Sequence, residues 1–313
     1  MTKKNKIIFI AGQDGFLGKA LSKNLSAQGY RILSCPKNID LTNLANALRV
    51  TRKADLIINA AGLVTSRVDQ LKRPAEIFYA NSLIQFQLLE AAAKNNIDHF
   101  ISISSITAYP QEAPSPIKEI WLTKNIHPDI EKGASYYALS KWLAAPSLKA
   151  YAQQYDFKTT LIVFPNLYGP EDKFNHSVPP LIPNLIKNIH KALKTNQKSF
   201  SAGSGPGKHI ELLHVDDASD FIVQVIKKPP LGFQCINAGH GRSVTLKKVC
   251  NLINRTILFR GIITWNDSEK STPRCLSASL SRKLYNWHPS INLEKGISET
   301  ASWYLNHVKK SKT

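Results

Sequence analysis

One stretch near the start of the chain, a short apolar run followed by three evenly spaced glycines, constrains the fold most. Residues 7–11 read IIFIA, and Gly12, Gly15 and Gly18 follow them. An apolar run this short, with glycine directly behind it, is typical of a strand buried on both faces. Apolar residues at helical spacing come next. Residues 6–25 therefore predict a strand, a glycine turn and a helix.

This predicted turn is suited to a diphosphate group. Glycines let the backbone approach a pyrophosphate closely, and the first turn of a helix offers free N–H groups and a partial positive charge. The spacing GxxGxxG differs from the simplest dinucleotide fingerprint, GxGxxG, and three glycines also serve close packing alone. The regular alternation of strands and helices further along favours the dinucleotide-binding interpretation.

Predicted strands and helices go on alternating as far as about residue 165. The predicted strands lie at 30–34, 54–60, 100–104 and 159–165, and the longer predicted helices lie at 75–94 and 136–155. This order is typical of an α/β protein with a doubly wound parallel sheet. We therefore predict a Rossmann-type dinucleotide-binding domain over residues 1–165.

Prolines interrupt the alternation beyond residue 165. A turn is expected at 166–170, helices near 181–194 and 245–258, and short strands near 234–237 and 261–265. This mixture predicts a smaller C-terminal α+β domain over residues 166–313, which mainly binds substrate. A part of it, about residues 210–240, is expected to return to the Rossmann part.

The chain is strongly basic, with 41 Lys and Arg against 22 Asp and Glu and a formal charge of +19. Such an excess fits nucleic-acid binding, attraction to anionic lipid, or a basic surface around a site for phosphorylated ligands. The lysines are dispersed and are not interleaved with aromatic residues, as a nucleic-acid platform would require. We favour the third interpretation and expect no specific nucleic-acid partner.

Cysteine usage and hydropathy bear on the compartment. Cys35, Cys235, Cys250 and Cys275 are scattered and form no CxxC pair. This pattern predicts a reduced compartment, the cytoplasm, and no thiol-based metal site. No apolar run approaches the length of a membrane span, and none is expected.

The end of the second predicted strand bears on the choice of cofactor. In this fold an acidic residue at that place holds the ribose 2′-hydroxyl of NAD. Residues 34–38 read SCPKN and carry no carboxylate. Lys37 would pair with a 2′-phosphate, which favours NADP. An ordinary surface lysine fits the pattern as well, so NAD stays open.

Three further residues predict carbonyl chemistry. Tyr137 and Lys141 lie four residues apart, so a helix would place them on one face. A nearby ammonium favours phenolate, and we expect it to lower the pKa of Tyr137. Ser105 follows the fourth predicted strand, at the sheet edge where this fold gathers its ligands. Together these groups would polarise a carbonyl and supply a proton while a nicotinamide delivers hydride.

With these motifs the chain resembles the extended short-chain dehydrogenases/reductases, the NAD-dependent epimerase/dehydratase family, and within it the GDP-L-fucose synthase branch. Further segments that carry the resemblance are NLYGP at 166–170, LHVDD at 213–217 and TPR at 272–274. The resemblance covers nearly the whole chain. It implies an NAD(P)-dependent oxidoreductase or epimerase of nucleotide-linked sugars, which usually feed polysaccharide biosynthesis, and a homodimer formed by the helices at 75–94 and 136–155.

The resemblance and the residue patterns together give a set of candidate site residues. The catalytic candidates are Ser105, Tyr137, Lys141 and His176, the last as an acid in epimerisation. The cofactor-binding candidates are Gly12, Gln13, Gly15, Phe16, Leu17, Gly18, Lys37, Asp40, Leu41, Ala60, Ala61, Gly62, Asn81, Tyr137, Lys141, Pro165 and Leu167. The substrate-binding candidates are Thr107, Asn166, His176, Lys187, Lys208 and Arg274.

The chain departs from the branch at several of its functional positions. Thr107 stands where the branch has an epimerising cysteine. A hydroxyl is far too weak an acid to replace a thiolate base, so the epimerase half-reaction is expected to be absent or altered. Asn184 and Ile210 stand where the branch has phosphate-binding arginines. Lysines nearby do not replace a bidentate arginine, which leaves Arg274 as the candidate for the substrate diphosphate.

Three functions remain open at this stage. The first is an NADP-dependent reductase of a nucleotide-linked 4-keto-6-deoxy sugar. The second is a 4-epimerase that retains and recycles its NAD. The third is a dinucleotide-binding regulatory protein without turnover. Dehydration is not expected, because Ile106 and Thr107 stand where dehydratases have an acid pair. His209, His214, Asp216 and Asp217 match no familiar ligand spacing, so no metal is predicted.

Overall fold

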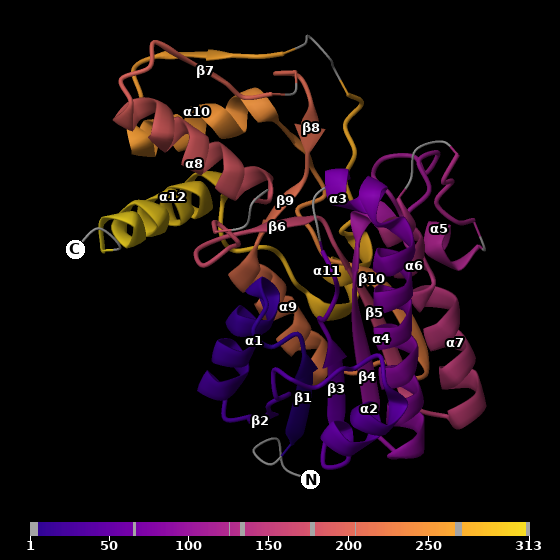
Figure 1. Cartoon of the computed structure of the whole chain (residues 1–313). Helices are drawn as coiled ribbons and strands as arrows, with labels where there is room; N and C mark the ends of the chain where they lie inside the picture. Colours follow the sequence, from indigo (N-terminus) through magenta and orange to yellow (C-terminus); the bar gives the residue numbers. More distant parts are fainter. Residues whose placement is uncertain are drawn as a thin grey trace.

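The computed structural model describes residues 6–64, 67–124, 126–131, 135–175, 179–203, 205–266 and 271–310, and only the backbone at 67–69, 309 and 310 (Figure 1). One candidate, His176, lies outside the described residues.

A central sheet of six parallel strands confirms the predicted Rossmann-type α/β fold. Its order is β10-β5-β4-β3-β1-β2. The strands are β1 (Ile7–Ala11), β2 (Arg31–Leu33), β3 (Leu56–Asn59), β4 (His99–Ser105), β5 (Lys158–Phe164) and β10 (Phe233–Asn237). All neighbouring pairs are parallel. The order reverses between β1 and β3, and ligands of such sheets bind at that reversal, beyond the carboxyl ends of the strands.

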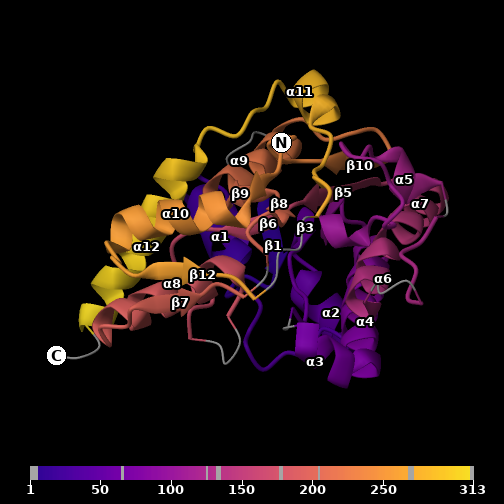
Figure 2. The same cartoon turned by 90° about the horizontal axis from the view of Figure 1, so that it is seen from above.

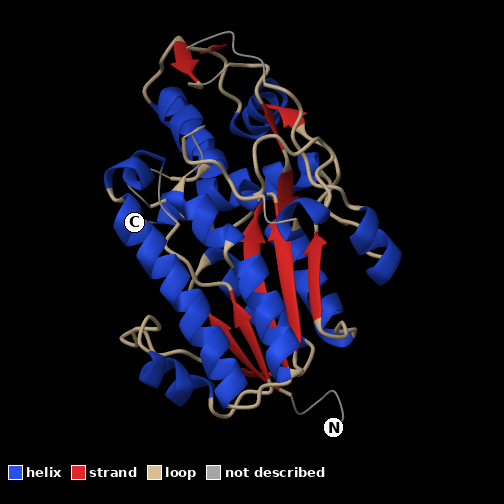
Figure 3. Cartoon of the chain, turned by 90° about the vertical axis from the view of Figure 1, so that its right-hand side faces the viewer, coloured by secondary structure: helices blue, strands red, loops and turns tan. Residues whose placement is uncertain are grey.

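Helices cover both faces of the sheet, which Figure 3 shows as strands between two helical layers. Helices α1 (Phe16–Ala27) and α9 (Val215–Lys227) cover one face. The other face is covered by α2 (Leu44–Thr51), α4 (Pro74–Lys94) and α7 (Ala144–Tyr155). Strand β1 shows why both faces are apolar. Ile8 and Ile10 pack into the core under α1 and α9, whereas Phe9 and Ala11 pack into the core under α4.

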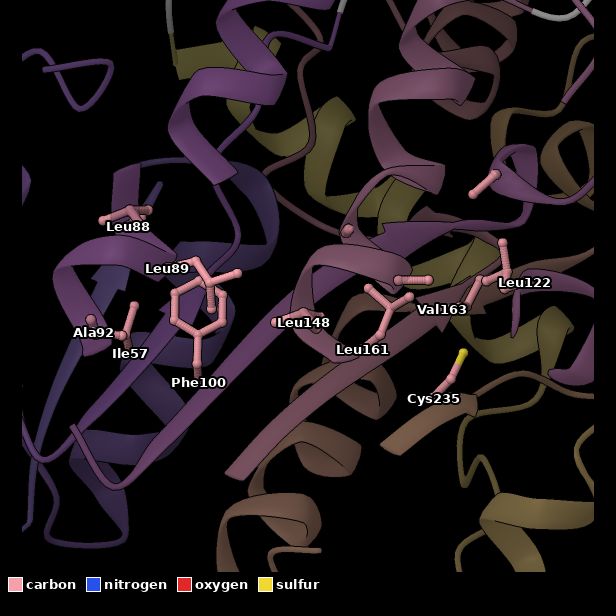
Figure 4. Packing of buried hydrophobic residues seen from close by; sticks show 14 of the residues in the cluster. Ile57, Leu88, Leu89, Ala92, Phe100, Leu122, Leu148, Leu161, Val163 and Cys235 are labelled. Atoms are coloured by element: carbon pink, nitrogen blue, oxygen red, sulfur yellow. The ribbon is translucent and has the colours of Figure 1, made fainter. Parts of the chain in front are cut away.

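Figure 4 shows the second of these cores at close range. Leu88 and Leu89 of α4 and Leu148 of α7 meet Phe100 of β4 and Leu161 of β5. All five side chains are fully buried. Burial of a large apolar side chain contributes roughly 1.5–3 kcal/mol. This packing holds α4 and α7 against the sheet.

The single helix expected at 136–155 is instead two helices, α6 (Tyr136–Trp142) and α7. Pro146 lacks a backbone N–H and cannot donate to the carbonyl of Trp142, so the helix is interrupted at Leu143. The predicted helix at 75–94 is present as α4. No helix of the described ranges is long and apolar enough to cross a membrane.

The C-terminal part surrounds a third apolar core between α8 (Leu181–Lys194), α10 (Leu246–Ile257) and α12 (Leu293–Lys310). Figure 2 shows these helices together on one side of the molecule, away from α4, α6 and α7. Short strand pairs complete this part: β7 (Ser199–Ser201) with β12 (Ile262–Thr264), and β8 (His209–Ile210) with β11 (Val244–Thr245). The remaining short helices are α3 (Arg67–Lys72), α5 (Ile120–Thr123) and α11 (Ser279–Tyr285).

The segment at 166–170 was expected to be a turn, and that expectation is wrong. Residues Asn166–Tyr168 form strand β6, which pairs in parallel with β9 (Leu212–His214). The backbone groups of this segment form hydrogen bonds with β9, about 45 residues later in the chain. A local sequence pattern cannot predict such a pairing. Within the LHVDD segment, β9 ends at His214 and α9 begins at Val215. The division into domains at residue 165 stays a prediction.

Candidate active site

A cavity of about 380 Å³ lies at the carboxyl ends of β1, β3, β4 and β5. Many of the predicted site residues line it: Gly12, Gly15, Phe16, Leu17, Gly18, Ala60, Ala61, Gly62, Ser105, Tyr137, Lys141, Pro165, Asn166 and Leu167. The wall also contains residues that sequence reasoning did not name: Val64, Ile103, Ser104, Phe164, Asp172, Lys173 and Pro180. The cavity thus joins the predicted glycine turn to the predicted carbonyl chemistry.

The glycine turn is packed so closely that side chains would not fit. Gly12 has a φ of +80°, and a Cβ there would lie 2.8 Å from the Cα of Ala61. A Cβ on Gly18 would collide with the carbonyl oxygen of Gly12. The N–H of Gly15 donates to that same carbonyl at 2.9 Å. Gly12 and Gly18 are therefore required for close packing of the turn, whether or not a ligand binds. Because they carry no side chains, the backbone of the turn faces the cavity directly.

Helix α1 begins at Phe16, directly after this turn. Gly15 at the N-cap provides no side-chain cap, and no acidic residue lies in the first turn. The first N–H groups of a helix have no partner inside the helix and attract anions. The bare turn and the uncapped helix fit the diphosphate of a dinucleotide.

The opposite wall at Ala60–Gly62 is held by amide side chains. Asn59 accepts a hydrogen bond from the N–H of Ala61 at 3.2 Å. Asn81 accepts from the N–H of Leu63 at 2.9 Å and donates to the carbonyl of Ile77 at 2.8 Å. Asn81 was predicted to bind the cofactor, but it does not line the cavity. Its side-chain amide instead holds the segment after β3, which lines the cavity.

Ser105 ends β4, as predicted. Its Oγ accepts a hydrogen bond from the N–H of Thr107 at 3.3 Å, in the short 3₁₀ helix Ile106–Ala108. The hydroxyl can still donate its proton to a ligand in the cavity. Thr107 itself is exposed and does not line the cavity. Ser105 therefore lines the cavity, whereas Thr107, two positions later, does not.

Tyr137 and Lys141 both reach the cavity from α6. The Nζ of Lys141 donates to the carbonyl of Ile103 at 3.2 Å and lies 5.9 Å from the centre of the Tyr137 ring. Burial raises the pKa of Tyr137 to about 12 and lowers the pKa of Lys141 to about 8. The expected lowering of the tyrosine pKa is wrong for this structure, because burial outweighs an ammonium at this distance. Tyr137 holds its proton and is placed to act as an acid.

Asn166 is fixed by a neighbour that sequence reasoning missed. Its backbone N–H and its Nδ2 both donate to the carbonyl of Glu211 at 3.2 Å. The buried Glu211 carboxyl accepts from the N–H of Gly241 at 2.9 Å and of Leu276 at 2.7 Å. Burial raises the pKa of Glu211 to about 7. A lone acid beside the apolar run LLHV was the available signal, since such a group needs buried partners.

Several predicted cofactor contacts lie beside the cavity and not in its wall. The exposed Lys37 has its Nζ 4.0 Å from Asp14 Oδ2, so it lies next to the glycine turn. The Asp40 carboxylate accepts from the N–H and hydroxyl of Thr42, and these bonds lower its pKa. Leu41 packs into the core under α4. Gln13 belongs to the turn but is not part of the wall.

The basic residues predicted for the substrate are mostly bonded to backbone carbonyls. Arg274 donates to the carbonyls of Tyr109, Pro110 and Gln111 at 3.0–3.2 Å. Lys187 donates to the carbonyl of Phe174 at 2.8 Å. The exposed Lys208 does not line the cavity either. The structure therefore does not bring these three cations into the site.

The acidic and histidine residues of the LHVDD segment serve the backbone. His214 Nδ1 accepts from the N–H of Asp216 at 3.3 Å. Asp217 accepts from the N–H groups of Ser290 and Ile291 at 2.8 and 3.1 Å. In the part of the chain that the structure describes, no group of three or more His, Cys, Asp or Glu side chains could hold a metal ion.

Comparison with known proteins identifies the family. The model of the NAD dependent epimerase/dehydratase family matches residues 8–239. This chain belongs to that family. It is therefore an NAD(P)-dependent oxidoreductase/epimerase of the extended short-chain dehydrogenase/reductase type, in agreement with its fold and its glycine turn.

Relatives and solved structures agree along nearly the whole chain. GDP-L-fucose synthase 1 of Arabidopsis thaliana is 30% identical over 98% of this chain and 96% of its own length. The GDP-L-fucose synthase of Escherichia coli is 28% identical over 95% of this chain and 96% of its own length. The structure of the GDP-mannoheptose C4 reductase from Campylobacter jejuni with NADP bound matches with a TM-score of 0.85, at 24% identity, over 97% of this chain and all of that chain.

Proposed function

We propose that this enzyme uses NADPH to reduce the C4 carbonyl of a GDP-linked 4-keto-6-deoxy sugar. One observation carries the proposal: Ser105, Tyr137 and Lys141 line the same cavity as the glycine turn. Relatives of nearly equal length are named GDP-L-fucose synthase, and a solved relative of the same fold is named a GDP-sugar C4 reductase. These names support a GDP-linked substrate for this chain.

The chain's own residues supply a proton and hold the reacting groups. Ser105 donates a hydrogen bond to the C4 carbonyl oxygen. Tyr137 gives its proton to that oxygen, and Lys141 stabilises the phenolate that remains. NADPH supplies the hydride to the carbonyl carbon. Because burial raises the pKa of Tyr137 to about 12, the phenol is protonated throughout the physiological pH range before the reaction.

NADP is the cofactor that the second strand favours. Residues 34–38, directly after β2, contain no carboxylate, and Lys37 lies beside Asp14 of the glycine turn. In this position Lys37 would pair with the 2′-phosphate of NADP, and the exposed site makes the contribution of that pair modest. We therefore expect NADPH to be preferred over NADH by a measurable but not extreme factor.

Reduction is proposed to proceed without 3,5-epimerisation. Thr107 stands at the position of the branch's cysteine, is exposed, and is absent from the cavity wall. His176, the other epimerisation candidate, lies outside the described residues. A sugar with unchanged C3 and C5 is the expected product.

A cytoplasmic homodimer is proposed for the assembly and its location. The four cysteines are all free, which fits a reducing compartment. Tyr79 of α4 and Tyr136 of α6 are 64% and 41% exposed. Exposed aromatic side chains on two neighbouring helices suit a protein interface.

The test is a spectrophotometric assay of NADPH and NADH oxidation with GDP-4-keto-6-deoxy-D-mannose and with its dTDP and UDP counterparts. We expect turnover with NADPH and the GDP sugar, and NMR of the product should show C3 and C5 unchanged. Tightly bound NAD in the purified enzyme, with no net oxidation of NADPH, would favour the cofactor-retaining 4-epimerase. Absence of both would favour the regulatory dinucleotide-binding protein.

A further inference from the structure

A buried acid in the cavity wall is not used by the chemistry described above. Asp172 is 7% exposed and lines the cavity. Its Oδ1 accepts a hydrogen bond from the N–H of Lys173 at 2.7 Å. Its Oδ2 is shielded from solvent and, among the described residues, has no hydrogen-bond partner. Leaving a buried carboxylate oxygen unpaired is costly, so such an atom at a cavity points to a ligand.

The chain holds Asp172 firmly at this place. The carbonyl of Asp172 accepts from the N–H of Phe174 at 2.7 Å. Phe174 is buried in the third core and stacks on Tyr304 of α12 at 4.8 Å between ring centres. Lys187 of α8 donates to the carbonyl of Phe174. The short segment that carries Asp172 is thus anchored to two helices of the C-terminal part, and the carboxyl cannot easily turn away.

The chemistry of this wall restricts the ligand group. Lys173 lines this wall beside Asp172. A carboxylate accepts hydrogen bonds and repels phosphate, so the uncapped N–H groups at the glycine turn are the better place for the phosphates of a bound nucleotide. Burial raises the pKa of Asp172 to about 6, and the group is therefore ionised at pH 7.5. Ser105 and Tyr137 in the same cavity are placed to act on a carbonyl. A hydroxyl group on the same sugar is the donor that fits Oδ2.

We propose that Asp172 Oδ2 accepts a hydrogen bond from a hydroxyl group of the bound sugar and so selects for sugars that carry this hydroxyl. The proposal rests on the proposed function, because the sugar is the substrate named there. It assigns to the C-terminal wall a role in recognising the sugar, separate from the proton and hydride transfer. Charge-assisted hydrogen bonds of this kind are among the strong ones.

The test compares Asp172→Asn with Glu171→Gln, which changes a neighbouring exposed carboxylate in the same way. In Asp172→Asn the amide oxygen still accepts from Lys173, so the amide NH₂ replaces the free acceptor by a donor. We expect the KM for GDP-4-keto-6-deoxy-D-mannose to rise about tenfold or more in Asp172→Asn, and to stay within about twofold in Glu171→Gln. The affinities for NADPH, measured by fluorescence, and for GDP, measured by calorimetry, should be unchanged in both.

A thermal melt separates binding from folding. Because Asp172→Asn removes a buried charge with an unpaired oxygen, the melting temperature of the ligand-free variant should be no lower than that of the ligand-free wild type. A KM equal to that of Glu171→Gln, or a loss that falls on NADPH or GDP instead of the sugar, would overturn the role of Asp172. A wild type that reduces no 4-keto sugar would overturn the proposed function, and that failure is visible before any variant is compared.

Discussion

The two walls of the cavity offer opposite chemistry to a ligand. The wall formed by the sheet, α1 and α6 presents uncapped N–H groups at the start of α1, the hydroxyl of Ser105 and the ammonium of Lys141. The wall formed by the C-terminal part presents the buried carboxylate of Asp172, with Lys173 next to it. Anions are therefore favoured on one side and hydroxyl donors on the other. A nucleotide-linked sugar has this division within one molecule, and the contrast explains how the site could orient it.

The largest expected effect is on the sheet side. Tyr137→Phe removes the proton donor and keeps the ring, so kcat should fall about 10³-fold while NADPH affinity stays within a few fold. Stopped-flow or steady-state absorbance at 340 nm would measure it. Tyr136→Phe is the matched control, since Tyr136 precedes it on α6 and is 41% exposed. Equal losses in both variants would place the effect in the helix and not in the phenol.

A pH-dependent difference in the free energy of unfolding is expected between the wild type and Asp172→Asn, a variant on the C-terminal side of the cavity. The pKa of Asp172 is raised from 3.8 to about 6 by burial, so the folded state binds this proton more tightly than the unfolded chain. Its contribution to stability is present below about pH 4 and is lost as pH rises through 6. Relative to Asp172→Asn, the wild type should lose about 2–3 kcal/mol of unfolding free energy between pH 4 and pH 7.

Urea titrations of both proteins across this pH range would measure that difference. Glu211, whose pKa is also raised to about 7, contributes in the same direction in both proteins and cancels. Parallel stability curves for the two proteins would show that Asp172 is not held in an unfavourable charged state.

A smaller effect is expected from filling the glycine turn. In Gly18→Ala the new Cβ would collide with the Gly12 carbonyl, so the turn must shift and NADPH affinity should fall about tenfold. Gly29→Ala is the control, because Gly29 also has a positive φ, +82°, but has nothing near its Cβ position. That variant should lose about 1 kcal/mol of stability and keep its NADPH affinity. Unchanged affinity in Gly18→Ala would refute the diphosphate site.

The smallest effect is expected at Arg274. Its guanidinium holds the carbonyls of residues 109–111, so Arg274→Met should cost about 1 kcal/mol of stability and change the KM for the GDP sugar less than threefold. Arg255→Met, which breaks an exposed pair with Glu294, should cost less. A KM that rises thirtyfold in Arg274→Met would instead restore its predicted role at the substrate diphosphate.

Residues at the sheet could be predicted because local pattern decides their place. A buried strand followed by glycines, and a serine directly after a strand, reach the same edge of a parallel sheet wherever the helices pack. Gly12, Ser105 and Tyr137 therefore meet in one cavity as expected. The expected lowering of the Tyr137 pKa was wrong because sequence spacing places Lys141 near the phenol but does not show that both groups are buried.

Residues of the C-terminal part could not be predicted in the same way. Arg274 and Lys187 satisfy carbonyls of loops far away in sequence, and the sequence shows only that they are basic. Asp172 reaches the cavity because Phe174 is anchored on α12, more than a hundred residues further along the chain. Tertiary packing, and not local periodicity, selects which of these side chains faces the cavity.

The most direct test of NADPH-dependent reduction at C4 follows the hydride itself. The enzyme is given GDP-4-keto-6-deoxy-D-mannose and NADPH deuterated at the transferred position of the nicotinamide, in ordinary water, and the sugar product is examined by NMR. Reduction by this enzyme should place one deuterium at C4, and a second run with unlabelled NADPH in D₂O should place none at C3 or C5. A product without deuterium at C4 in the first run would contradict reduction at this site.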